Sequence, residues 1–169
     1  MHISKAAISH TMKKLTLATL LIFSCATAWA ADFDKGLAAY KAGDFATALA
    51  EFKPLAEQGD AIAQYNLALV YQFGEGVIED DKEAAKWYRL AAEQGYAAAQ
   101  SRLGFMYGTG QGVIQDNVYA HMWFNIAASN GYKDARDNKD NLVKQMTPQD
   151  ISKAQDLARE CVKKNYKDC

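Results

Sequence analysis

The middle of the chain carries two stripes of apolar residues at helical spacing, separated by glycines. From Gln64 to Tyr71 the positions i, i+3, i+4 and i+7 fall on one face of a helix, which predicts a first helix in this stretch. Gly74 and Gly76 then interrupt the pattern. A second helix is predicted by a second stripe, made of Ala84, Trp87, Tyr88 and Ala91. The pattern therefore favours two helices joined by a short glycine-containing turn.

The second of these helices has signals at both ends. Asp80 is a side-chain acceptor of the kind that caps a helix N-terminus, and Glu83 three residues later completes a capping-box pattern. Gly95 follows the last apolar position, where a residue that adopts positive φ commonly ends a helix. We therefore expect this helix to begin next to Asp80 and to end before Gly95.

The same pattern occurs twice without a gap. Residues 60–95 and 96–131 align at an offset of 36 residues and are identical at 15 of the 36 positions. A fixed period of this size is typical of stacked helical repeats. One helix pair cannot bury its apolar face alone, whereas stacked pairs share a continuous core. The sequence therefore predicts a solenoid.

The flanking segments continue this organisation less regularly. Residues 31–59 resemble a shortened helix pair, with Asp44 as the N-cap of its second helix. Residues 132–169 leave the repeat pattern, but Thr147 and Pro148 predict the start of a last helix. We expect about four helix pairs, with the polar last unit capping the stack.

The two copies resemble the Sel-1-like repeat family, a relative of the tetratricopeptide repeat. Both contain A-x-x-Q-x-x-L-x-x-x-Y-x-x-G-x-G-V-x-x-D-x-x-x-A-x-x-W-[YF]-x-x-A-A-x-x-G. The resemblance implies an all-α, right-handed α-α superhelix that holds protein partners. It does not by itself imply any chemistry, and it implies no cofactor.

The first thirty residues have the pattern of an export signal. Met12 begins a stretch with two lysines, an apolar run and the small-residue sequence Ala28–Ala30, which predicts a cleaved signal peptide over residues 1–30. The apolar run is too short to span a membrane. A lipid anchor at Cys25 is the alternative interpretation of this leader. Either way, we expect a periplasmic or secreted protein.

Charge and cysteine content refine this picture. Residues 1–30 hold three of the 19 Lys and Arg residues and none of the 20 Asp and Glu, so the remaining chain has a formal charge of −4. Without a basic patch, nucleic acid is not an expected partner. Cys161 and Cys169 are the cysteines left after the leader, and an even number in an exported protein predicts a disulfide. Two free thiols are the alternative.

The chain lacks the residues that metal or nucleophilic chemistry needs. His121 is the single histidine after the leader, and the pattern places it, partly exposed, on the second helix of its copy. No serine after the leader has a lysine three residues later, so the S-x-x-K pair of penicillin-recognising enzymes is absent. The glycine turns lack a Gly-Lys-Ser/Thr ending, which argues against phosphate binding. We expect no catalytic site and no metal site.

A candidate partner-binding surface lies on the first helix of each copy. In solenoids of this type the first helices line the concave surface, and most positions on that face differ between the two copies. An apolar centre with polar neighbours suits an anchor-and-rim interface. Packing of the apolar members against the next repeat is the alternative. The candidate residues are Ile62, Asn66, Leu69, Phe73, Arg102, Phe105 and Thr109.

These observations lead to one main hypothesis and two alternatives. The main hypothesis is a non-catalytic module of the bacterial cell envelope that binds a protein or peptide in its concave groove. The first alternative is a β-lactamase-like or peptidoglycan-binding envelope protein. The second is a secreted effector that meets host proteins.

Overall fold

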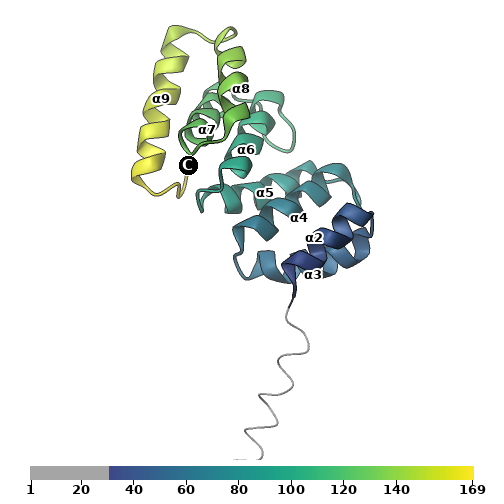
Figure 1. The fold of residues 1–169 in the computed structure, drawn as a ribbon. Coiled ribbons are helices and arrows are strands. Elements are labelled where there is room, and N and C mark those ends of the chain that lie inside the picture. Colours follow the sequence, from purple (N-terminus) through teal and green to yellow (C-terminus); the bar gives the residue numbers. More distant parts are fainter. Residues whose placement is uncertain (1–30) are drawn as a thin grey trace, which may run out of the picture. The chain divides into compact units, whose positions relative to one another are not determined.

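The computed structural model of the chain describes residues 31–169, which form eight helices and no strand (Figure 1). The helices are α2 (Phe33–Ala42), α3 (Phe45–Glu57), α4 (Ala61–Phe73), α5 (Asp81–Ala92), α6 (Ala97–Thr109), α7 (Asn117–Ser129), α8 (Lys133–Val143) and α9 (Pro148–Lys163). The predicted all-α solenoid is confirmed. The predicted signal peptide and Cys25 lie outside the described residues.

Six of the helices form three regular pairs. Within each pair the helices pack on each other: α2 on α3, α4 on α5, and α6 on α7. The second helix of each pair also packs on the first helix of the next unit, so that α3 contacts α4, α5 contacts α6 and α7 contacts α8. The main hydrophobic cluster runs through both copies and on to the last helix.

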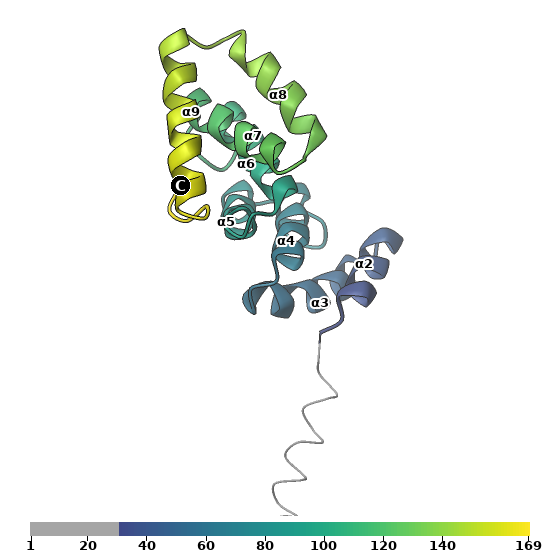
Figure 2. The same ribbon diagram turned by 60° about the vertical axis from the view of Figure 1, so that its left-hand side comes forward.

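The last two helices do not form the fourth pair that the sequence predicts. Helix α9 packs on α7 rather than on α8 (Figure 2). The reason lies on the outer face of α7, where Met122 and Ile126 replace Lys86 and Leu90 of the first copy. Met122 and Ile126 are each 1% exposed, because α9 covers them. An apolar outer face on α7 thus attracts the last helix away from α8.

Aspartate and threonine caps fix the helix starts as expected, with one difference at α5. The Asp80 carboxylate accepts the Glu83 N–H at 2.9 Å, as predicted. The second half of the predicted capping box is wrong, since the Asp80 N–H donates to the Tyr71 carbonyl at 2.9 Å. The Glu83 carboxylate instead pairs with Lys86 at 2.6 Å. The N-cap thereby ties α5 to the end of α4 as well.

Two buried glutamines connect each repeat to the one before it. The side-chain amide of Gln64 donates to the Ala56 carbonyl at 3.0 Å, and that of Gln100 donates to the Ala92 carbonyl at 3.1 Å. Each glutamine also accepts a hydrogen bond from the end of its own repeat, Gln64 from Gln94 and Gln100 from Asn130. These bonds satisfy carbonyls that a helix end leaves free.

The second glycine of each turn makes the other contact between repeats. A Cβ atom on Gly112 would lie 2.1 Å from the carbonyl oxygen of Asp81, at the start of α5. A Cβ atom on Gly76 would lie 2.8 Å from the Cβ of Phe45, at the start of α3. Both glycines also have positive φ. Glycine is therefore required here for close approach and for backbone conformation together.

A disulfide-closed tail follows α9. Cys161 and Cys169 are bonded, with their Cα atoms 5.4 Å apart, as the sequence predicts. Within the loop, the Tyr166 hydroxyl donates to the Asn130 side chain at 3.2 Å, and the Tyr166 ring lies against Gly95. The tail therefore contacts the ends of both repeats.

We expect Gly112→Ala to destabilise the protein more than the matched variant Gly131→Ala. Both positions have positive φ, but nothing lies within 4 Å of a Cβ on Gly131. Both variants incur about 1–2 kcal/mol for the left-handed backbone, and the Asp81 contact adds about 1–3 kcal/mol at Gly112. Urea unfolding followed by circular dichroism measures the difference. Equal midpoints for the two variants would show that the repeats do not depend on this contact.

We expect the double variant Cys161→Ala/Cys169→Ala to lose about 2–3 kcal/mol of unfolding free energy, because an open tail gains conformational freedom in the unfolded state. Reduced wild-type protein is the control, since it has the same open loop without a change in composition. The two unfolding curves should coincide. A double variant as stable as the oxidised protein would contradict the stabilising role of the disulfide.

Candidate functional site

An open pocket of about 210 Å³ lies between α6 and α8. Its apolar part consists of Phe105 on α6, Phe124 on α7 and Leu142 on α8. The Phe124 ring is close to α6, since a Cβ on Gly104 would lie 2.7 Å from it. Phe105 remains 43% exposed at this site. The pocket thus presents an accessible aromatic surface.

Carboxamide side chains surround this apolar surface. Three of them, Asn138, Asn141 and Gln145, come from α8 and the turn after it, and Asn117 comes from the start of α7. Asn141 accepts a hydrogen bond from Lys144 at 2.9 Å. Asn138 and Gln145 make no side-chain hydrogen bond within residues 31–169. The pocket rim therefore offers uncharged donors and acceptors.

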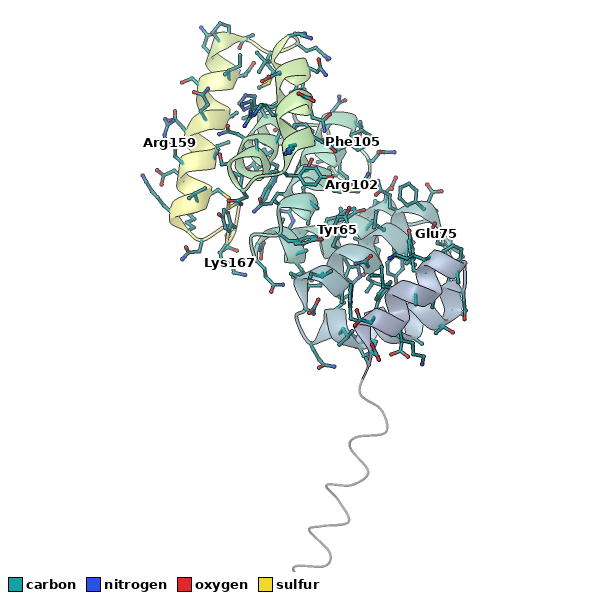
Figure 3. The ribbon with its side chains drawn as sticks, in the orientation of Figure 1. Tyr65, Glu75, Arg102, Phe105, Arg159 and Lys167 are labelled. Carbon is teal, nitrogen blue, oxygen red and sulfur yellow. A yellow bond between two sulfur atoms is a disulfide. The ribbon has the colours of Figure 1, made fainter. Side chains whose placement is uncertain are left out.

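Arg102 lies one helical turn from Phe105 on the same face of α6 (Figure 3). Its side chain is half-buried. Burial lowers the pKa of Arg102, but the neighbouring tyrosines, Tyr65 first among them, outweigh burial and raise the pKa overall. No ion pair within residues 31–169 involves Arg102. Arg102 is therefore a permanent cation without a carboxylate partner.

On the other side of Arg102 the surface is acidic and aromatic. Burial, and secondly the neighbouring Glu75 carboxylate, raise the pKa of Tyr40 to about 12, so its hydroxyl stays protonated. One carboxylate oxygen of Glu75 is buried without a hydrogen-bond partner in the described structure. Figure 3 shows Glu75 and Tyr65 on the first-repeat side of Arg102.

The predicted surface residues separate into two groups. Phe105 and Thr109 line the pocket. Ile62 and Phe73 on α4 are exposed, at 45% and 54%, but lie outside the pocket.

Two predictions for α4 need correction. Asn66 is 9% exposed, and its amide donates to the Ile62 carbonyl at 2.8 Å, so the prediction of an open polar rim there is wrong. Leu69 is partly buried and packs against the main core, which was the alternative interpretation. The helical phase inferred from sequence thus placed these two residues on the open surface, whereas the structure turns them toward the core.

The α8 contribution to the pocket was missed. Sequence reasoning assigned residues 136–141 to the polar outer surface of a cap. A signal was nevertheless available, because Asn138, Asn141 and Gln145 recur at i, i+3 and i+7 and carry no charge. A solvated cap face usually carries charges rather than a row of amides.

His121 differs from its prediction in exposure. His121 is 2% exposed, so the expectation of a partly exposed histidine is wrong. The second copy has His121 where the first has the small Ala85, and the side chain is enclosed between helices. Within the described part of the chain, no group of three or more histidine, cysteine or acidic side chains is placed to hold a metal.

A family model described as the Sel1 repeat matches residues 61–96 and 97–132. Residues 61–132 are two Sel1 repeats. The matched ranges begin one residue later than the repeat boundaries drawn from the sequence. Solenoids built from Sel1 repeats are typically protein-interaction modules and generally non-catalytic scaffolds.

Two solved structures resemble this Sel1-repeat chain. One is c5321, a protective antigen present in uropathogenic Escherichia coli strains that displays an SLR fold, with 31% identity and a TM-score of 0.73 over 78% of the chain. The other is a Sel1 repeat protein from Oxalobacter formigenes, with 28% identity and a TM-score of 0.65 over 76% of the chain. The chain spans 30% of the first structure and 55% of the second. A comparison with curated proteins gives no match.

Among the helices of residues 31–169, none combines the length and the apolar character that a membrane crossing requires.

We expect His121 to make the fold less stable as the pH falls below about 6.5. Burial, and secondly the charge of Lys139, lower the pKa of His121, whereas Asp140 acts weakly in the opposite direction. The unfolded chain therefore binds this proton more readily than the folded chain, and stability is lost as the pH falls from the unfolded pKa toward the lower folded pKa.

Unfolding free energies measured in urea at pH 7.5, 6.5 and 5.5 test this expectation. The variant His121→Gln should flatten the pH dependence in this window. Lys139→Gln should reduce the dependence without removing it. An unchanged slope in His121→Gln would assign the pH dependence to other groups.

Proposed function

We propose that the protein is a non-catalytic binding module of the bacterial cell envelope, and that it binds a protein or peptide at the surface formed by α6 and α8. The observation that supports the proposal is the open pocket between α6 and α8, which the exposed Phe105 lines. Exposed aromatic side chains within a polar rim are typical of interface anchors. The surrounding carboxamides can exchange hydrogen bonds with water for hydrogen bonds with a partner.

The cellular part of the proposal rests on two sequence features. The leader over residues 1–30 has the organisation of a signal peptide. The Cys161–Cys169 disulfide suits an oxidising compartment such as the periplasm or the exterior. The non-catalytic part of the proposal rests on the kinds of residue present. His121 is enclosed, and within residues 31–169 no group of three or more histidine, cysteine or acidic side chains is placed to hold a metal.

Affinity capture from an envelope extract, read out by quantitative mass spectrometry, tests this function. The baits are the purified protein, Phe105→Asp and the control variant Ile78→Asp. Phe105 lies in the pocket, whereas Ile78 is 90% exposed on the turn between α4 and α5. We expect a partner to be retained by the wild type and by Ile78→Asp, and to be lost at least tenfold from Phe105→Asp, because a carboxylate cannot replace an apolar anchor.

Two checks make the experiment decisive. Equal helicity of the three baits by circular dichroism shows that the loss is not caused by misfolding. Partners retained equally by all three baits, or turnover of nitrocefin well above a boiled sample, would contradict the proposal and would favour the wall-binding or β-lactamase alternative.

A further inference from the structure

We infer that this surface binds the extended C-terminal end of a protein partner, with the terminal carboxylate on Arg102 and an apolar side chain in the pocket beside Phe105. The inference rests on the proposed function and adds the chemical class of the ligand. Three independent features support it, namely an unpaired cation, a pocket of limited size and a row of carboxamides.

Arg102 is the feature that specifies charge. Its side chain is half-buried, and it lacks a carboxylate partner within residues 31–169. A guanidinium can hold a carboxylate through two parallel hydrogen bonds, which are stronger than neutral ones. Arg159 and Lys163 on α9 differ in this respect, since Arg159 is paired with Asp156 and Lys163 with Glu160. The net negative charge of the chain does not attract anions, so binding of a carboxylate depends on the local charge of Arg102.

The size of the pocket indicates that the ligand has one apolar side chain next to its carboxylate. Its volume of about 210 Å³ accommodates a single branched aliphatic or aromatic group. Arg102 and Phe105 are separated by three residues of helix, a rise of about 4.5 Å. A terminal carboxylate and the side chain of the same residue branch from one Cα atom and can reach both positions at once.

The carboxamides of the pocket rim suit a ligand with an extended peptide backbone. Asn138, Asn141 and Gln145 project toward the pocket from successive turns of α8 and the segment after it. Each amide provides both a donor and an acceptor, which matches the alternating N–H and C=O groups of a peptide. A peptide with its end at Arg102 can run along α8 and make these hydrogen bonds.

The acidic surface beyond Arg102 favours a chain end over an internal aspartate or glutamate. An internal acidic residue requires the peptide to continue past Arg102 toward Tyr65 and Glu75. There it would approach the negative charge of Glu75 (Figure 3). A peptide that ends with its carboxylate on Arg102 stops before this position, so it avoids the electrostatic conflict.

Two bead-bound libraries of random pentapeptides test the inference, one with free C-terminal carboxylates and the other with C-terminal amides. We expect the protein to enrich carboxylate peptides that end in an apolar residue. Amidation of the selected peptides should weaken binding about tenfold or more, measured by fluorescence anisotropy. Arg102→Gln should bind acid and amide forms equally, Arg102→Lys should retain part of the difference, and Arg159→Gln should behave as wild type.

Phe105→Ala tests the pocket separately, since it should keep the preference for the carboxylate while losing the preference for an apolar last residue. Equal enrichment from both libraries, absence of any selected sequence, or an acid-over-amide preference that persists in Arg102→Gln would overturn the inference. If these occur while capture from envelope extract still depends on Phe105, the proposed function stands and only the ligand class is wrong.

Discussion

The structure depends on how closely one repeat can approach the one before it. At Gly112 the backbone touches the Asp81 carbonyl at the start of α5, and the Gln100 amide binds the Ala92 carbonyl at its end. Both ends of a second helix are therefore held by the following repeat. This spacing lets a short helix pair, unable to bury its own apolar face, share a continuous core with its neighbours.

Contacts between repeats account for two of the identities between the two copies. Gln64 and Gln100, and likewise Gly76 and Gly112, occupy equivalent places and make equivalent contacts. Other identical positions, such as Leu67 and Leu103, belong to the core, and many of the remaining positions differ between the copies. Where the first copy has Asn66 turned back onto its own helix, the second has Arg102 facing the surface without an anion.

The irregular end of the solenoid shapes the candidate site. Because the outer face of α7 is apolar, α9 packs there and α8 is left without a second helix of its own. Helix α8 is then supported mainly by α7, and the space between α6 and α8 remains open as the pocket. The disulfide-closed tail holds α9 in this position through Tyr166 and its contact with Asn130.

The sequence by itself determined the repeat, the helices, their caps at Asp44, Asp80 and Thr147, and the pairing of the two cysteines, because these depend on local periodicity and on residue chemistry. Of the candidate surface residues named from the sequence, Phe105 and Thr109 line the pocket. Only the tertiary structure decided that Asn66 and His121 are buried, that α9 leaves α8, and that α8 completes the pocket. Those outcomes depend on which faces of distant helices meet, and helical periodicity fixes the spacing of a face but not the partner that covers it.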